Sequence, residues 1–103
     1  MKKLELVIVI LNSGYSDALM DEARECGAKG GTVINARGTA KEDVEKKFDI
    51  RIHPEKEIVF IVAPVSIKDK ILHAVYQKFG TNSNAQGIAF TVPVDDQVGI
   101  TTK

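Results

Sequence analysis

Two strand-length segments that are apolar at almost every position constrain the fold of this chain most. Residues 4–11 read LELVIVIL, in which Glu5 is the one polar member, and residues 58–63 read IVFIVA. A strand with one solvated face alternates apolar and polar side chains, whereas a strand buried on both faces is a continuous apolar run. We therefore expect both faces of the sheet to be covered.

Two further strands are predicted from short β-branched segments beside glycines. They read GTVINA at residues 31–36 and GIAFTV at residues 87–92. Pro64 closes the apolar run at 58–63, because proline cannot donate to a strand ladder. The chain therefore contains four strands.

Two helices lie between these strands in the sequence. The first is predicted over about 16–27, with Ser13 or Ser16 as its cap and Gly27 as its end. The second begins at Ser66-Ile67-Lys68-Asp69, which resembles a capping box, and ends at Gly80. The residues expected to face the core share helical spacing: Leu19, Ala23 and Cys26 in the first helix, and Ile67, Ile71, Ala74, Val75 and Phe79 in the second.

The order β-α-β-loop-β-α-β is typical of the α+β ferredoxin-like fold. This fold is a βαββαβ sandwich, a four-stranded antiparallel sheet with two helices on one face. We expect a single domain over residues 1–103 with a flexible loop at about 38–56 and a short helical turn around 41–48. A connection of that length is usually functional or mobile.

Two helices cover one face of such a sheet, yet the strands do not alternate. Because the chain offers no further helix, the second face must be covered by other copies of the chain. The alternative is that some of these apolar side chains are simply exposed, which is common on protein surfaces. The pattern favours a homo-oligomer without fixing the number of subunits.

Composition excludes several classes of protein. Among 103 residues, 14 are Lys or Arg and 14 are Asp or Glu, so no charge excess indicates a nucleic-acid partner. The single cysteine, Cys26, rules out an internal disulfide. No apolar segment approaches the ~20 residues that span a bilayer, so we expect a cytoplasmic protein that is not itself embedded in a membrane.

Several segments carry a family resemblance. The run Gly27-Ala28-Lys29-Gly30-Gly31-Thr32-Val33, followed by Arg37-Gly38, looks like the segment after the first helix in nitrogen regulatory P-II proteins. Met1 to Glu5 resembles the opening of that family, and Ile61 to Pro64 resembles its third strand with the following proline. The glycines at 80 and 87 flank a loop where the family has its glycine-rich loop.

The resemblance implies a ferredoxin-like homotrimer that is a regulator and not an enzyme. An adenine nucleotide such as ATP or ADP is then the effector, bound in clefts between subunits, and no other cofactor is assigned. The loop at 38–56 is expected to dock on a partner protein, either a transporter or an enzyme of metabolism.

The chain departs from the family at its phosphate contacts. Ile58 replaces a lysine of the third strand, Asn84-Ala85-Gln86-Gly87 replaces Gly-Asp-Gly-Lys, and the stretch 94–99 lacks an Arg-x-Arg pair. Charge-assisted bonds to Lys and Arg are the strong phosphate contacts, so a triphosphate would be poorly neutralised. We therefore interpret the chain as a divergent P-II-like protein with a shortened signalling loop.

Four residues are the candidate ligand-binding set: Thr32, Arg37, Gly38 and Gly87. Thr32 could hydrogen-bond a base, Arg37 could pair with a phosphate or carboxylate, and the glycines could bring backbone N–H groups to an anion. An ordinary strand threonine, a solvated arginine and simple turns would explain the same residues.

Other functions stay open on the sequence. No nucleophile–base pair has plausible spacing, so no catalytic residue is assigned. A structural adaptor without a ligand is possible on this pattern. So is a metal-responsive trimer resembling the divalent-cation tolerance proteins, although His53 and His73 are far apart and no metal ligand is assigned.

Overall fold

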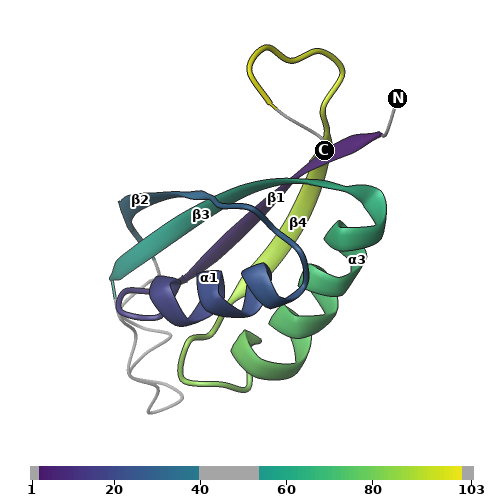
Figure 1. Ribbon diagram of the computed structural model, residues 1–103. Helices are drawn as coiled ribbons and strands as arrows, with labels where there is room; N and C mark the ends of the chain where they lie inside the picture. The colour runs from purple at the N-terminus through teal and green to yellow at the C-terminus, as the bar shows by residue number, and fades with distance from the viewer. Residues whose placement is uncertain (1–2, 40–53, 101–103) are drawn as a thin grey trace.

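The computed structural model describes residues 3–39 and 54–100. The chain forms one four-stranded antiparallel sheet in the order β2-β3-β1-β4. Its strands are β1 (Leu4–Asn12), β2 (Thr32–Arg37), β3 (Glu55–Pro64) and β4 (Ile88–Pro93). The helices are α1 (Ser16–Glu25) and α3 (Val65–Ala74), the second continued by a π-helical segment, η1 (Val75–Phe79) (Figure 1). The α+β ferredoxin-like prediction is confirmed.

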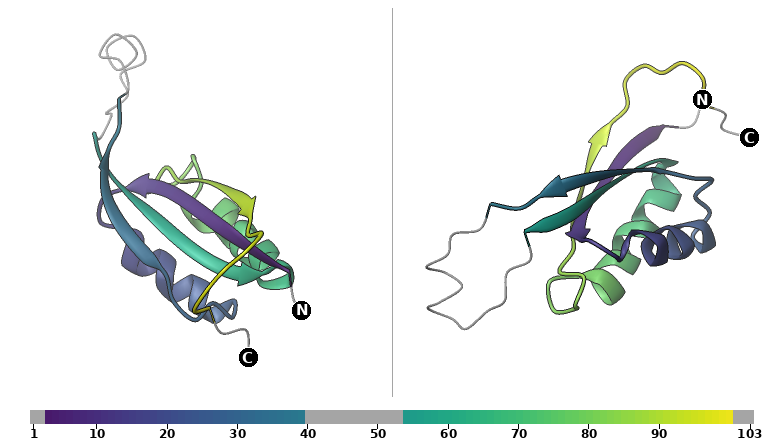
Figure 2. Two further views of the ribbon diagram at one scale, coloured as in Figure 1. Left: turned by 90° about the horizontal axis from the view of Figure 1, so that it is seen from above. Right: turned by 90° about the vertical axis from the view of Figure 1, so that its left-hand side faces the viewer.

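Both helices lie on the same face of the sheet (Figure 2). Alternate side chains of the two central strands point toward them and are fully buried, namely Val7, Val9, Leu11, Val59, Ile61 and Ala63. The helices contribute the buried side chains Leu19, Met20, Ala23, Ile71, Val75 and Phe79. Ile67 and Cys26 pack against this core while only partly buried. The helical spacing in the sequence therefore identified the covered face, except for Ala74, which is only partly buried and lies outside this core.

Both predicted helix caps are wrong. Tyr15 occupies the cap position of α1, which places Ser16 inside the first turn, and no side chain caps the helix. Helix α3 follows β3 without a loop, with Pro64 as its cap, so Ser66 is already the second helical residue. The extended backbone of Pro64 (φ −60°, ψ 156°) makes the turn from strand to helix that the serine was expected to make.

No helix formed by residues 3–39 or 54–100 lies over the other face of the sheet. In the cross-strand register, Ile8 lies between Phe60 and Phe90, and the same parity continues along all four strands. We call this surface the open face. Its members are Leu6, Ile8, Ile10, Thr32, Ile34, Ile58, Phe60, Val62, Ile88, Phe90 and Val92.

These members are apolar apart from Thr32, and the rim of the open face is well exposed. The same register places the polar pair Asn12 and Lys56 at one end of this face. Phe90 exposes 46% of its surface and Ile88 exposes 51%. A monomer rarely exposes a contiguous apolar patch of this kind unless the patch is an interaction site. The strands that are apolar at almost every position in the sequence thus form this apolar open face as well as the buried face.

The connection between β2 and β3 is slightly shorter than predicted. Because β3 begins at Glu55, the last two residues of the expected loop 38–56 belong to the strand. The predicted helical turn around 41–48 lies outside the described residues. Within the two described ranges, no helix is long and apolar enough to cross a membrane.

Candidate functional site

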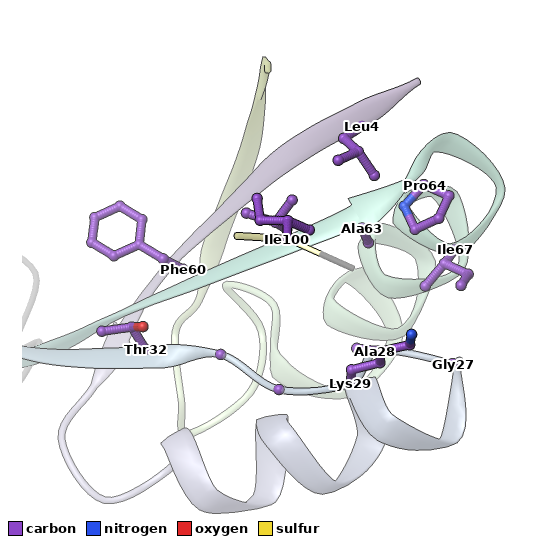
Figure 3. A pocket seen from close by; sticks show the side chains of 13 residues that line it. Leu4, Gly27, Ala28, Lys29, Thr32, Phe60, Ala63, Pro64, Ile67 and Ile100 are labelled. Carbon is purple, nitrogen blue, oxygen red and sulfur yellow. The ribbon is translucent and has the colours of Figure 1, made fainter. Parts of the chain in front are cut away.

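A cavity of about 530 Å³ lies where β2 stops covering the edge of β3. The pairing of these strands ends at Thr32 and Phe60, so β3 residues 61–64 extend past the start of β2. The loop 27–31 forms the opposite wall. Figure 3 shows Thr32 and Phe60 at one end of this cavity and Pro64 and Ile67 at the other. We call it the edge cavity.

The wall of the edge cavity exists because α1 ends in a sharp turn. The Gly27 N–H donates to the Arg24 carbonyl at 3.0 Å, and the Ala28 N–H donates to the Ala23 carbonyl at 3.0 Å. These two bonds form a Schellman motif, which needs a left-handed residue, and Gly27 supplies it with φ +115°.

Gly31 holds the same wall against the sheet. A β-carbon at this position would lie 2.9 Å from the Phe60 carbonyl oxygen and 2.9 Å from Met20 Sδ. The backbone can therefore approach β3 this closely only without a side chain. At Gly30, by contrast, a β-carbon would meet no heavy atom within 4 Å.

The C-terminal segment contributes to the edge cavity as well. The Val94 N–H donates to the Leu4 carbonyl at 3.2 Å, and beyond it the chain turns back so that Ile100 lines the cavity (Figures 1 and 3). The Ile100 N–H donates to Gln97 Oε1 at 2.9 Å across this turn. A residue remote in sequence from the glycine loop thus forms part of the same hollow.

A second, polar cluster lies at the far end of the sheet. Asn12 is 4% exposed. Its Nδ2 donates to the Asn84 carbonyl at 2.9 Å and to Gln86 Oε1 at 3.3 Å. The ammonium group of Lys56 donates to Asn12 Oδ1 at 2.6 Å. A buried amide therefore fixes a lysine at the start of β3, beside a cavity of about 380 Å³ that Asn12 and Asn84 help to line.

The four predicted site residues do not come together within one protomer. Thr32 lines the edge cavity, whereas Arg37 is at the other end of β2, about 17 Å away along the strand. Gly38 and Gly87 also lie at that far end, near the polar cluster. A single site that used all four residues would need two copies of the chain.

Both glycine N–H groups already have acceptors inside the protomer. Gly38 donates to the Pro54 carbonyl at 2.5 Å, and Gly87 donates to the Phe79 carbonyl at 2.6 Å. Gly87 is glycine for a steric reason, because a β-carbon there would lie 2.5 Å from the Phe79 carbonyl oxygen. Backbone donation from these two residues to an anion therefore has no support in this structure.

Two lysines on the helices have shifted pKa values. The side-chain hydrogen bond to Asp69 raises the pKa of Lys68, and the hydrogen bond to Glu22 raises that of Lys78. Both pairs lie on the helix side of the sheet. No cluster of three His, Cys, Asp or Glu side chains suited to a metal ion occurs within residues 3–39 and 54–100.

Sequence reasoning missed Asn12, Lys56 and Ile100. The polarity of Asn12 directly after an apolar strand was a signal, because a buried amide requires partners. Its contact with Lys56 spans 44 residues, however, and nothing local predicts it. Ile100 lies in a tail read only as mostly polar, so its place in the edge cavity emerges from the fold alone.

Comparison with known proteins agrees with this architecture. The sequence profile of the nitrogen regulatory protein P-II family matches residues 1–103. No curated protein matches the chain significantly in sequence.

Solved structures resemble the fold at low sequence identity. The B. subtilis GlnK–ATP complex has a TM-score of 0.73 and 18% identity, with 95% of this chain and 89% of that chain covered. A PII-like signalling protein from Thermus thermophilus has a TM-score of 0.70 and 22% identity, covering 90% and 87%. The PII-like protein CPII from Thiomonas intermedia, bound to ADP, AMP and bicarbonate, has a TM-score of 0.66 and 16% identity, covering 95% and 97%. With the profile match over the whole sequence, the chain belongs to the nitrogen regulatory protein P-II family.

Proposed function

We propose that this protein is a cytoplasmic homotrimeric regulator, not a catalyst, that senses a small effector between its subunits. Through the loop 38–56 it acts on a partner protein such as a transporter or a metabolic enzyme. One observation carries the proposal: the edge cavity opens onto the open face. Leu4, Thr32 and Phe60 all line the cavity and point to that side of the sheet.

The open face supplies the driving force for assembly. Burial of apolar surface contributes roughly 25 cal/mol per Å², and the rim side chains of this face are about half exposed in a protomer. A neighbour that covers the open face would also stand beside the edge cavity. A ligand bound there would then report on the assembled state.

Assembly also resolves the separation of the predicted site residues. Thr32 of one protomer and the far end of β2 of its neighbour could lie on opposite sides of one cleft. Arg37 would then approach a ligand whose apolar part occupies the edge cavity. This arrangement gives Arg37 a role that it cannot have at the Thr32 end of its own protomer.

The effector class follows from family membership and from the related structures. GlnK from B. subtilis was solved with ATP, and CPII with ADP, AMP and bicarbonate. The edge cavity has apolar walls from Leu4, Val62 and Ile67 and the exposed backbone edge of β3. Apolar walls with a few polar backbone groups suit a planar base.

Sedimentation equilibrium combined with calorimetric titration tests this function. Three protomers of 11.2 kDa give a particle of about 34 kDa, and we expect an adenine nucleotide to bind it. The variant Thr32→Val, which removes the hydroxyl at the cavity mouth, should keep the mass and weaken the binding. A monomer at micromolar concentration, or a trimer that binds no adenine compound, would contradict the proposal.

A further inference from the structure

We propose that the effector of this protein carries little negative charge, as a nucleoside or a nucleoside monophosphate does, and that a triphosphate is disfavoured. This inference rests on the proposed function, because it concerns the same site. The inference is based on the charges and the hydrogen bonds of the described residues at both ends of the sheet.

The edge cavity itself supplies little positive charge. Among the described residues that line it, Lys29 is the one cation, and most of the others are glycine or apolar. The backbone of residues 27–31 and the outer edge of β3 can recognise a flat polar group by hydrogen bonding. They cannot neutralise a chain of phosphates, which requires Lys or Arg.

Two N–H groups of the loop between η1 and β4 donate to carbonyls of the same loop. The Ser83 N–H donates to the Gly80 carbonyl at 2.9 Å, and the Gln86 N–H donates to the Ser83 carbonyl at 3.1 Å. Together with the Gly87 bond to Phe79, these contacts close the loop on itself. A loop that cradles phosphate does the opposite and presents successive N–H groups to the anion.

At the far end of β2, the described cations and carboxylates are equal in number. Arg37 lies directly opposite Glu55 in the β2–β3 register. Lys56 lies between Glu55 and Glu57 in the sequence. Its ammonium group donates to Asn12 Oδ1. These four charged side chains carry two positive and two negative charges, so the described residues at this end would bring no net positive charge to a neighbour's edge cavity.

The consequence is a penalty that grows with each phosphate. Every additional phosphate brings negative charge that must leave water, and desolvated charge is costly without a cation beside it. Arg37 could approach a single phosphate. For two more phosphates, the described residues of the edge cavity and of the far end of β2 offer no excess of cations over carboxylates beyond Lys29.

Calorimetric titration of the full chain with adenosine, AMP, ADP and ATP at one ionic strength tests the inference. We expect AMP to bind about tenfold or more tightly than ATP, and adenosine to bind within about tenfold of AMP. The variant Gly30→Leu should abolish binding of the whole series, because Gly30 lines the edge cavity and a β-carbon there meets no heavy atom within 4 Å. Gly30→Ala, which adds one methyl group at the same position, is the matched control and should retain binding.

A second variant tests the electrostatic cause. Glu55→Gln removes the carboxylate opposite Arg37 and leaves the Glu55 carbonyl, which accepts from the Ser13 N–H at 3.2 Å. We expect the ratio of ATP to AMP dissociation constants to fall by about threefold or more. An unchanged ratio would overturn the charge-matching explanation.

The outcomes separate this inference from the proposed function. If ATP binds most tightly, the inference is wrong and the nucleotide-sensing function stands. If none of the four compounds binds to an intact trimer, both fail. Binding of AMP and adenosine with ATP far weaker supports both.

Discussion

The two faces of the sheet have similar side chains and opposite surroundings. Ile61 and Phe60 are neighbours on β3, yet Ile61 is completely buried under the helices, whereas Phe60 lies on the open face and is only partly buried. Hydrophobicity alone does not distinguish them. The difference comes from the cover, which the chain supplies for one face from its own helices and for the other face, on our proposal, from another copy.

This contrast separates two kinds of stability. Side chains on the covered face stabilise the protomer whatever its concentration. Side chains on the open face contribute through association, so their effect depends on protein concentration. Substitutions on the two faces should therefore differ in kind as well as in size.

The largest expected effect is on the covered face. Ile61→Ala should lower the free energy of unfolding by about 3 kcal/mol, because it removes fully buried methyl groups and leaves a cavity. Urea denaturation at several protein concentrations measures it, and the loss should be the same at each. Phe60→Ala is the matched change on the open face, and its loss should instead vary with concentration. Equal, concentration-independent losses would show that the two faces do not differ in this way.

Assembly should be lost when a charge is placed on the open face. Phe90→Lys puts an ammonium group on an apolar surface that a neighbour would desolvate, at a cost of about 2 kcal/mol or more in association free energy. Sedimentation equilibrium should show a smaller particle. Tyr76→Lys, at a residue that is 80% exposed and off this face, is the control and should keep the parental mass. A parental mass for Phe90→Lys would exclude the open face as the interface.

The edge cavity lies at the boundary between the faces, and Gly31 fixes its wall. Gly31→Ala should cost about 1–2 kcal/mol in unfolding free energy, because its methyl group would press on the Phe60 carbonyl and on Met20. Gly30→Ala, one residue away, has open space around it and should cost much less. Thermal unfolding of the two variants measures the difference. Similar midpoints would mean that the loop does not need this close approach.

The sequence predicted the fold well because its signals are local. Each signal lies within a short stretch of sequence. The apolar run predicted β1, Gly27 predicted the end of α1, and the spacing of Ile71 and Val75 predicted the buried side of the second helix. The caps were wrong for a related reason. A serine followed three residues later by an acid at 66–69 fits a capping box, but the helix had already begun at Val65.

The candidate site was only partly predictable. Thr32 lies in the edge cavity, but it was chosen through a family resemblance and not through its own chemistry. The roles of Ile100 and Lys56 could not be predicted, because each depends on a contact with residues distant in sequence. Ile100 lines the edge cavity, and Lys56 bonds to Asn12. The glycine at 87 was expected to serve a ligand, whereas its N–H and its lack of a side chain are both used by the contact with Phe79. A glycine in a loop does not by itself reveal whether it binds a ligand or allows a close contact within the protein.

The smallest expected effect concerns an exposed ion pair on the covered side. The Lys78 ammonium group donates to Glu22 Oε1 at 2.8 Å and ties η1 to α1. This bond raises the pKa of Lys78 above its ordinary value of 10.5. A raised pKa in the folded state stabilises the protein below that ordinary value, and the contribution is lost as the pH rises through the folded-state pKa.

Lys78→Met should therefore lower the urea midpoint slightly at neutral pH and not at all well above pH 10.5. The effect should be smaller than that of any substitution above, since exposed pairs contribute little. Lys70→Met removes another exposed lysine from α3 and serves as the control. A Lys78→Met effect that persisted undiminished at high pH would come from packing of the lysine stem, and the ion pair would then add nothing to the covered face.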